Sequence, residues 1–454
     1  MRAEDVREVL ETILPNDVIL KAAEEFGLQQ RERKLDVARL LRAMVMSAAT
    51  GYGGRQADVL RMYLHNGAPK VVRGAFYRWF GEGLEKVMKQ ISDIAIGYAK
   101  RQPVDLPGWL GEHVRDWHIV DSSTVQLDDS LQAEYPGAGD YAAVKVHKRF
   151  SVGIGAAIAY HLSPAREHDS KHLKIDESWK GLGLLADLGY VSLMLLQDCD
   201  DCGVSYCVRL KENWKPKVNH IARGTINGTL FEGADLDVLL DREILLLDGR
   251  AIDADVTIGG WLESRLVAVD TPKGYCFYLT NLPPSVGPRQ IADLYRIRWE
   301  IESDNKLDKS CSKLDRIQAR TGASVRALIH ASMISSMIMN LLAHHHRIKE
   351  TRPARQGQPR TTPPIHPQSL GRALAAASND IAWAMEMRGL EAERKWAQIT
   401  SYLEHLGQDP NWRSRPSVLD QLRGWQIAPG RPRKMRAASF RPTANGNMLC
   451  KNRA

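Results

Sequence analysis

Four side chains suited to binding phosphate or metal share one side of the charged stretch 291–309. The stretch has no Pro or Gly, and its apolar residues recur at spacings of three and four, which predicts a helix. At roughly 100° per residue, Tyr295, Arg298, Glu302 and Lys309 then lie on a face about 60° wide. A carboxylate binds hard divalent cations, an arginine pairs with phosphate in a bidentate manner, and a lysine supplies a point charge. Glu302 is the only carboxylate on that face.

The other acidic residues of this stretch do not join that face. Asp293, Glu300, Asp304 and Asp308 project roughly 140° to 220° from Tyr295 on the same helical wheel. We therefore expect a single carboxylate such as Glu300 or Asp304 to be dispensable for activity. The competing interpretation is an ordinary surface helix whose charges are all solvated.

Two acidic residues upstream each follow an apolar run. Asp121 comes directly after His-Ile-Val and Asp187 directly after Leu-Leu-Ala. An unpaired ion buried at such a place costs several kcal/mol, so each carboxylate must be paired, hydrogen-bonded or metal-bound. The alternative is that each begins a turn, because Asp-Ser-Ser and Asp-Leu-Gly are both common turn starts.

The pattern Tyr-x2-Arg-x3-Glu-x6-Lys resembles the YREK signature of the IS4-type (Tn5-like) DDE transposases. The segments IVDSST around Asp121 and ADLGY around Asp187 resemble the two aspartate motifs of that family, and RLKEN at 209–213 resembles the basic strand end that follows. The resemblance implies a triad of Asp121, Asp187 and Glu302. Such a triad holds two Mg²⁺ ions, with Mn²⁺ as a substitute, for cleavage and joining of DNA.

Basic and aromatic residues near the triad are the candidates for holding DNA. On the signature stretch these are Tyr295, Arg298 and Lys309. On the strands we add Lys145, Lys148 and Arg149, together with Arg209 and Lys211. The alternative for the strand residues is the ordinary solubility of edge strands.

The order of the predicted elements favours an α/β fold with an RNase H-like catalytic core. Strands are predicted at 116–127, 142–155 and 156–162, and helix and strand alternate after them. The long interval between Asp187 and Glu302 holds further β-rich runs, among them Asp237 to Leu247, which indicate an insertion into the core. We thus expect a mixed five-stranded sheet with helices, interrupted by a β-rich insertion and flanked by helical regions at both ends.

The predicted domains follow from these changes between helical and β-rich sequence along the chain. They are a helical DNA-binding domain at 1–104, core segments at 105–212 and 291–350, an inserted β-domain at 213–290, a Pro-rich linker at 351–368 and a C-terminal helical region with a basic tail at 369–454. Within the first domain, helices are predicted from Ala3, Asp17, Lys34 and Arg55, and one helix spans 74–99.

Composition narrows the setting of the protein. The chain has 454 residues and a net charge of +8, and from Gln421 onward it has eight basic residues and no acidic one. Such a tail is either a polyanion-binding arm or a soluble end. We expect no secretory signal, no transmembrane helix and a cytoplasmic, nucleoid-associated bacterial protein. The lone pair Cys199-x2-Cys202 and the consecutive His344 to His346 do not indicate a zinc site.

The function predicted is a cut-and-paste DNA transposase acting as a homodimer on paired ends. Its DNA partners are the terminal inverted repeats and the target duplex. The relative best known for forming a hairpin stacks a Trp on a flipped base, whereas this sequence has Tyr275, Cys276 and Phe277 at that strand. The resemblance therefore implies metal-dependent strand cleavage more directly than a hairpin, for which Trp261 and Tyr275 are the candidate substitutes. The alternatives are a nuclease without strand transfer and a non-catalytic DNA-binding regulator.

Overall fold

The computed structural model describes residues 1–28, 35–50, 55–223, 235–236, 251–271, 274–312, 314–350, 363–412 and 416–425. The chain forms two compact units. The first unit comprises Met1–Asp105, Ser122–Glu167 and Glu300–Trp412, and the second comprises Leu106–Asp121, His168–Trp299 and Arg413–Ala454. The strand that carries Asp121 therefore contributes to both units.

The first unit is mostly helical. Its N-terminal helices are α1 (Ala3–Ile13), α2 (Asn16–Glu25), α3 (Val37–Ala48), α4 (Gln56–His65), α5 (Arg73–Tyr77) and α6 (Glu82–Lys100). Its later helices are α10 (Trp299–Ser312), α11 (Gly322–Glu350), α12 (Pro367–Ala376), α13 (Ser378–Glu386) and α14 (Leu390–Leu406). Amphipathic spacing explains α1, whose Val6, Val9, Leu10 and Ile13 are fully buried on one face.

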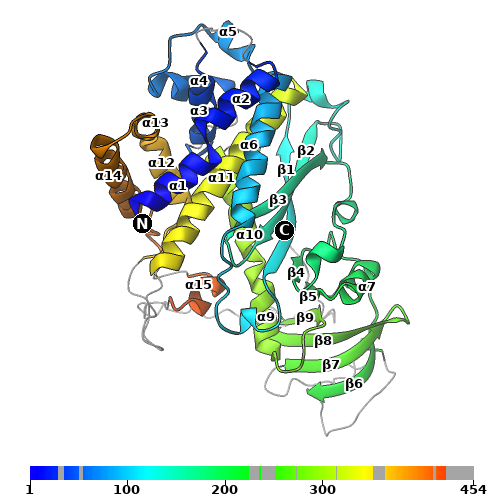
Figure 1. Cartoon of the computed structure of the whole chain (residues 1–454). Coiled ribbons are helices and arrows are strands. Elements are labelled where there is room, and N and C mark those ends of the chain that lie inside the picture. Colours follow the sequence, from blue (N-terminus) through cyan, green and yellow to red (C-terminus); the bar gives the residue numbers. More distant parts are fainter. Residues whose placement is uncertain are drawn as a thin grey trace, which may run out of the picture. The chain divides into compact units, whose positions relative to one another are not determined.

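Helix α11 is the core of the first unit. It is long and apolar enough to span a membrane by length and composition, yet 94 % of its most apolar window is buried inside the protein. It runs alongside α6 (Figure 1) and also packs against α1, α3 and α12. An apolar helix that is covered on all sides by other helices is a core helix of this unit.

The strands form a sheet in which both units take part through β1 (Trp117–Gln126). In the first unit β2 (Ala143–Ser151) pairs antiparallel with β3 (Ala156–Pro164). In the second unit β1 pairs parallel with β4 (Gly183–Ala186), and β4 pairs parallel with β5 (Ser205–Arg209). Helix α7 (Leu193–Asp201) connects β4 with β5, as a parallel connection requires.

The β-rich segment after β5 continues the same sheet. Strand β9 (Gly274–Thr280) pairs antiparallel with β5, and β8 (Leu262–Thr271), β7 (Ala251–Ile258) and β6 (Lys217–Arg223) follow outward. The full strand order is β3-β2-β1-β4-β5-β9-β8-β7-β6. The first five strands have the order of an RNase H-like core, so the predicted fold class is confirmed.

The second unit is completed by α9 (Pro288–Ile297) and α15 (Val418–Leu422), together with short 3₁₀ turns. Its apolar core includes Leu184 and Ala186 of β4, Leu196 of α7 and Leu266 of β8. Each compact unit is made of several separate chain segments, so the units do not correspond to the predicted domains. The predicted domain boundaries therefore stay a prediction.

Two predicted helices are each interrupted. The helix expected at 74–99 is divided into α5 and α6, and α6 begins after Gly81. The stretch 291–309 is divided at Arg298, which ends α9 with an N–H bond to the carbonyl of Tyr295 three residues back. Such a 3₁₀-type bond tightens the last turn, so a single helical wheel over the whole stretch is wrong.

Several predicted segments lie outside the described residues. These are the run from Asp237 to Leu247, most of the Pro-rich linker, and the basic tail beyond Trp425.

Candidate active site

Asp121 and Asp187 lie at corresponding places on two neighbouring parallel strands. The register pairs Ile119 with Leu185 and Val120 with Ala186, so the next residue on each strand is one of the two aspartates. Adjacent strands are about 4.8 Å apart, which brings the two carboxylates within reach of a shared ion. The apolar runs that precede them are buried, whereas Asp121 is half-buried and Asp187 is exposed.

Glu302 lies on the first two turns of α10 and is half-buried. It belongs to the first unit, whereas both aspartates belong to the second. The triad of these three residues therefore stays a prediction. Lys309 lies near the end of the same helix and is exposed.

Tyr295 and Arg298 lie together at the end of α9 in the second unit. The Arg298 guanidinium carbon is 5.5 Å from the centre of the Tyr295 ring, and the Tyr278 ring packs against the tyrosine at 5.3 Å. Tyr295 is only 6 % exposed, and its hydroxyl has no hydrogen-bond partner within the described part of the chain. Burial raises the pKa of Tyr295 to about 12, with Arg298 acting to lower it and Asp187 to raise it further.

Arg209 and Lys211 belong to the same neighbourhood as Asp187. Arg209 ends β5 and also influences the pKa of Tyr295, and its guanidinium is 3.5 Å from the Cys276 sulfur. Burial lowers the pKa of Lys211, and the charge of Asp187 opposes that shift. The second unit thus brings one carboxylate, two arginines, a lysine and a buried tyrosine hydroxyl into electrostatic contact.

A buried arginine, Arg265, holds the loop that precedes α9. Arg265 on β8 donates through Nε and Nη2 to both carboxylate oxygens of Asp253 on β7, at 2.8 and 2.7 Å. Its remaining donors reach the carbonyls of Leu282, Pro283 and Val286 at 3.2, 2.9 and 2.9 Å. All of its nitrogens are thereby used, and the loop that leads into α9 is held against the sheet.

The strand lysines do not behave alike. Lys145 is half-buried and donates to the carbonyl of Glu167 at 2.8 Å. Lys148 is buried, and its Nζ contacts Asp304 Oδ2 at 2.8 Å and also Asp308 Oδ2. The expectation that Lys148 holds DNA is therefore wrong, because its ammonium is already enclosed by two carboxylates.

Asp304 takes part in the same contacts. It is 6 % exposed, and its Oδ1 accepts hydrogen bonds from Asn340 at 2.8 Å and from Ser336 at 3.2 Å. Asp304 is thus a buried group whose two oxygens both have partners, and its dispensability for activity stays a prediction. Sequence reasoning missed this cluster, although the spacing of Asp304 and Asp308 by four residues was a usable signal for one shared face.

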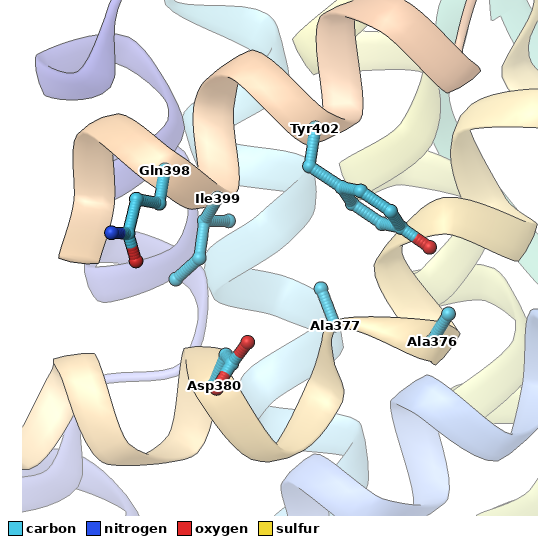
Figure 2. A pocket seen from close by; sticks show the side chains of 6 residues that line it. All are labelled: Ala376, Ala377, Asp380, Gln398, Ile399 and Tyr402. Carbon is cyan, nitrogen blue, oxygen red and sulfur yellow. The ribbon is translucent and has the colours of Figure 1, made fainter.

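A pocket of about 400 Å³ lies among the C-terminal helices. None of the predicted site residues belongs to its lining. Figure 2 shows its lining side chains, which are Ala376, Ala377, Asp380, Gln398, Ile399 and Tyr402. The carboxylate of Asp380 is paired with Lys395 at 2.7 Å. Its lining thus offers one paired acid and no nucleophile or base partner, so the pocket is not a candidate active site.

The donor set around Asp121 and Asp187 fits a divalent cation. Both donors are carboxylates on adjacent strand segments, Asp121 within β1 and Asp187 directly after β4, and hard ions such as Mg²⁺ and Mn²⁺ prefer oxygen ligands. Without an ion, two carboxylates this close repel each other.

Comparison with known proteins gives a consistent result. A family model described as a transposase DDE domain matches residues 114–338. The transposase for insertion sequence element IS231C of Bacillus thuringiensis subsp. berliner is 24 % identical over 261 residues, which cover 48 % of this chain and 55 % of that protein. The IS231D transposase of Bacillus thuringiensis subsp. finitimus is 22 % identical over 340 residues, covering 66 % and 71 %.

A more distant relative and one solved structure are also similar. The IS1151 transposase of Clostridium perfringens is 24 % identical over 243 residues, covering 44 % of this chain and 51 % of that protein. A cryo-EM structure of a piggyBac transposase synaptic complex with hairpin DNA has a TM-score of 0.45 at 10 % identity, covering 87 % and 85 % of the two chains. The chain spans about half the length of most of these sequence relatives.

The matched domain contains Asp121, Asp187 and Glu302. A core of RNase H-like strand order carries them, and the sequence relatives above are transposases of bacterial insertion sequences. Residues 114–338 of this chain belong to the transposase DDE domain family.

Proposed function

We propose that this protein is a DNA transposase that cleaves DNA at transposon ends and transfers the freed strand into target DNA. The observation that carries the proposal is the parallel register of β1 and β4, which sets Asp121 beside Asp187. The family match over 114–338 and the complete Tyr-Arg-Glu-Lys signature support it.

Asp121, Asp187 and Glu302 are proposed to hold two Mg²⁺ ions, for which Mn²⁺ can substitute. When bound, such ions activate the attacking oxygen and neutralise charge on the phosphate and on the leaving oxygen. The protein itself positions the phosphate and the carboxylates. The carboxylates define where the scissile phosphate lies, and the buried residues behind them keep those carboxylates in place.

Arg298 and Arg209 are proposed to pair with DNA phosphates beside Asp187, and Lys211 adds a positive charge there. The Tyr295 hydroxyl is proposed to donate to a phosphate oxygen, which would supply the partner that it lacks within the described chain. Lys309 and Lys145 are proposed as more peripheral contacts to the DNA backbone.

The proposed partners are double-stranded DNA with terminal inverted repeats, the target duplex, and a second copy of the chain on paired ends. If a hairpin forms, Trp261 is the better placed of the two candidate stacking residues. It is 48 % exposed at the turn between β7 and β8. Tyr275 is half-buried on β9, with its ring 6.4 Å from that of Phe277.

Replacing the signature glutamate tests the function. Glu302→Ala is expected to abolish cleavage of a duplex that carries the element's own terminal inverted repeat in Mg²⁺, and to leave binding of that duplex near normal. Cleavage is measured by strand release on denaturing gels and binding by mobility shift, and strand transfer is scored by joining of the freed end to a target plasmid. Retained cutting would refute the triad. Cutting without any joined product would identify a nuclease.

A further inference from the structure

The strongest feature that the proposed chemistry does not use is a buried charge cluster in the first unit. We name it the Lys148 cluster: Lys148 of β2, Asp304 and Asp308 of α10, and Ser336 and Asn340 of α11. The side chains of Lys148, Asp304 and Asp308 are 1 %, 4 % and 3 % exposed. The cluster therefore ties a strand and two helices together inside one compact unit.

The cluster lies on the opposite side of α10 from Glu302. At roughly 100° per residue, Asp304 and Asp308 project about 200° and 240° from Glu302. Hydrogen bonds and ion pairs thus hold the side of α10 that lies opposite to Glu302. A rotation of α10 about its axis would break these bonds and would at the same time change the direction in which Glu302 points.

Apolar packing alone fixes this helix poorly. Among the residues of α10 whose side chains are described, the buried apolar ones are Ile301 and Leu307, whereas Asp304, Asn305 and Asp308 are buried and polar. Apolar contacts are non-directional, so two of them leave the rotation of a helix weakly defined. Charged hydrogen bonds have a required geometry, and a buried ion pair is retained in some proteins for such specificity at a cost in stability.

Lys148 stays charged within the cluster, whereas burial raises the pKa of Asp308 to about 6. Burial acts to lower the pKa of Lys148, but the two aspartates overcome it and hold that pKa above its ordinary value. The ammonium therefore stays charged, and Asp304 makes more bonds than Asp308, because Ser336 and Asn340 donate to its second oxygen.

We propose that Lys148, Asp304 and Asp308 are positioning residues that set the rotation of α10 and thereby aim Glu302 at the metal site. The inference rests on the proposed role of Glu302. It assigns no contact with DNA or metal to the three residues themselves.

The test compares an apolar replacement with wild type. Replacing a buried ion cluster by apolar side chains of similar volume is often neutral or stabilising, so Lys148→Met/Asp304→Leu/Asp308→Leu is expected to melt near the wild-type temperature. With its directional bonds gone, cleavage at saturating DNA is expected to fall about tenfold to a hundredfold. Mn²⁺ affinity, measured without DNA from the EPR signal of the free ion, is expected to weaken about tenfold.

Single substitutions supply a second measurement if the triple variant fails to fold. Asp304→Asn is expected to weaken Mn²⁺ binding more than Asp308→Asn, because Asp304 has more hydrogen-bonding partners. The matched control is Lys89→Met/Asp93→Asn, which removes an exposed Lys–Asp pair of α6 and should change neither quantity.

Folded cluster variants with wild-type Mn²⁺ affinity and cleavage rate would overturn the inference. A separate Glu302→Gln variant distinguishes this failure from failure of the proposed function. If Glu302→Gln is inactive while the cluster variants are normal, only the positioning role is lost. If Glu302→Gln cleaves normally, the triad itself is wrong and the inference falls with it.

Discussion

At the level of single residues, the hydroxyl of Tyr295 bears directly on the proposed contact with DNA. A buried hydroxyl without a hydrogen bond costs free energy in the folded protein. This one lies within the second unit beside Arg298 and in the electrostatic range of Asp187 and Arg209. A DNA phosphate would remove that cost on binding, so the tyrosine is better suited to the complex than to the free protein.

Tyr295→Phe tests that interpretation. The variant is expected to melt at or slightly above the wild-type temperature, because no hydrogen bond within the described chain is lost. Cleavage is expected to fall about tenfold, as a hydrogen bond to a charged group is worth about 1.5 to 3 kcal/mol.

The pH dependence of the Tyr295→Phe effect provides its control. The pKa of Tyr295 is raised to about 12, so the hydroxyl remains a neutral donor throughout the range in which the enzyme can be assayed. The ratio of wild-type to variant rates should therefore be constant from pH 6 to pH 9, on an ordinary tyrosine pKa of about 10. A ratio that changes with pH would contradict the proposed donor role.

The sequence predicted the setting of the two aspartates better than it predicted the buried lysine. Both follow buried apolar runs as expected, and Asp187 directly follows the end of β4, but Asp121 is not at a strand end because β1 continues to Gln126. Lys148 lies in a strand with other basic residues, and its burial depends on Asp304 and Asp308 far along the chain. No local pattern reports a partner at that separation.

At the scale of elements, the signature stretch differs from a simple helix. Neither Pro nor Gly marks the break at Arg298, so propensity and periodicity gave no warning. The break separates Tyr295 and Arg298 on α9 from Glu302 and Lys309 on α10. What holds each helix is also different: Arg265 anchors the entry to α9, and the Lys148 cluster anchors α10.

Breaking the Arg265 anchor should be costly, and removing the whole pair should cost less. Arg265→Met leaves Asp253 buried without its partner and is expected to lower the free energy of unfolding by about 3 to 5 kcal/mol. The double variant Arg265→Met/Asp253→Leu is expected to recover part of that loss. Urea unfolding of these two variants and of the single variant Asp253→Leu measures the coupling, and simple addition of the two single effects would contradict the Arg265 anchor.

His330 of α11 gives the first unit a pH-dependent stability. Its Nδ1 lies 2.5 Å from the Tyr160 hydroxyl, and burial, aided by the charge of Lys89, lowers the pKa of His330 to about 4. The unfolded chain has an ordinary histidine pKa of about 6.5, so between these values the unfolded state binds more protons. The stabilising contribution is complete above pH 6.5 and is lost as the pH falls toward 4.

His330→Gln should remove this component. Between pH 7 and pH 5 the wild type is expected to lose more unfolding free energy than the variant, by up to about 1.4 kcal/mol per pH unit. Parallel curves for the two proteins in denaturant titrations would show that His330 titrates normally in the folded state.

At the level of the whole molecule, basic residues are concentrated at the C-terminal end of the sequence. The excess of basic residues begins at Arg423, while the described structure ends at Trp425, which is 3 % exposed and donates its N–H to the carbonyl of Asp420. A truncation that tests the tail should therefore keep Trp425 and α15 intact.

Ending the chain after Trp425 is expected to weaken DNA binding and its dependence on salt. Each lost phosphate contact lowers the slope of log affinity against log salt by about 0.9. Fluorescence anisotropy with a labelled duplex at several salt concentrations measures that slope. An unchanged slope together with an unchanged melting temperature would show that the tail does not touch DNA.

The fold class was predictable because the order of strands and helices along the chain already restricts the topology. The position of the β-rich insertion in the sheet was less predictable. A sequence rich in strand-forming residues does not indicate whether its strands form a separate sheet or extend an existing one. Here β9 hydrogen-bonds directly to β5 through Cys207 to Arg209.

That pairing has a practical consequence for anyone who wishes to shorten this protein. Deleting the insertion would leave β5, a strand with Cys207 and Val208 fully buried, as an open edge whose backbone donors and acceptors invite pairing with other chains. In the intact second unit the outermost described strand is β6, whose register is irregular and which carries Lys217, His220 and Arg223. Charges and bulges of this kind discourage edge-to-edge association, so a minimal catalytic core should keep the insertion in order to stay soluble.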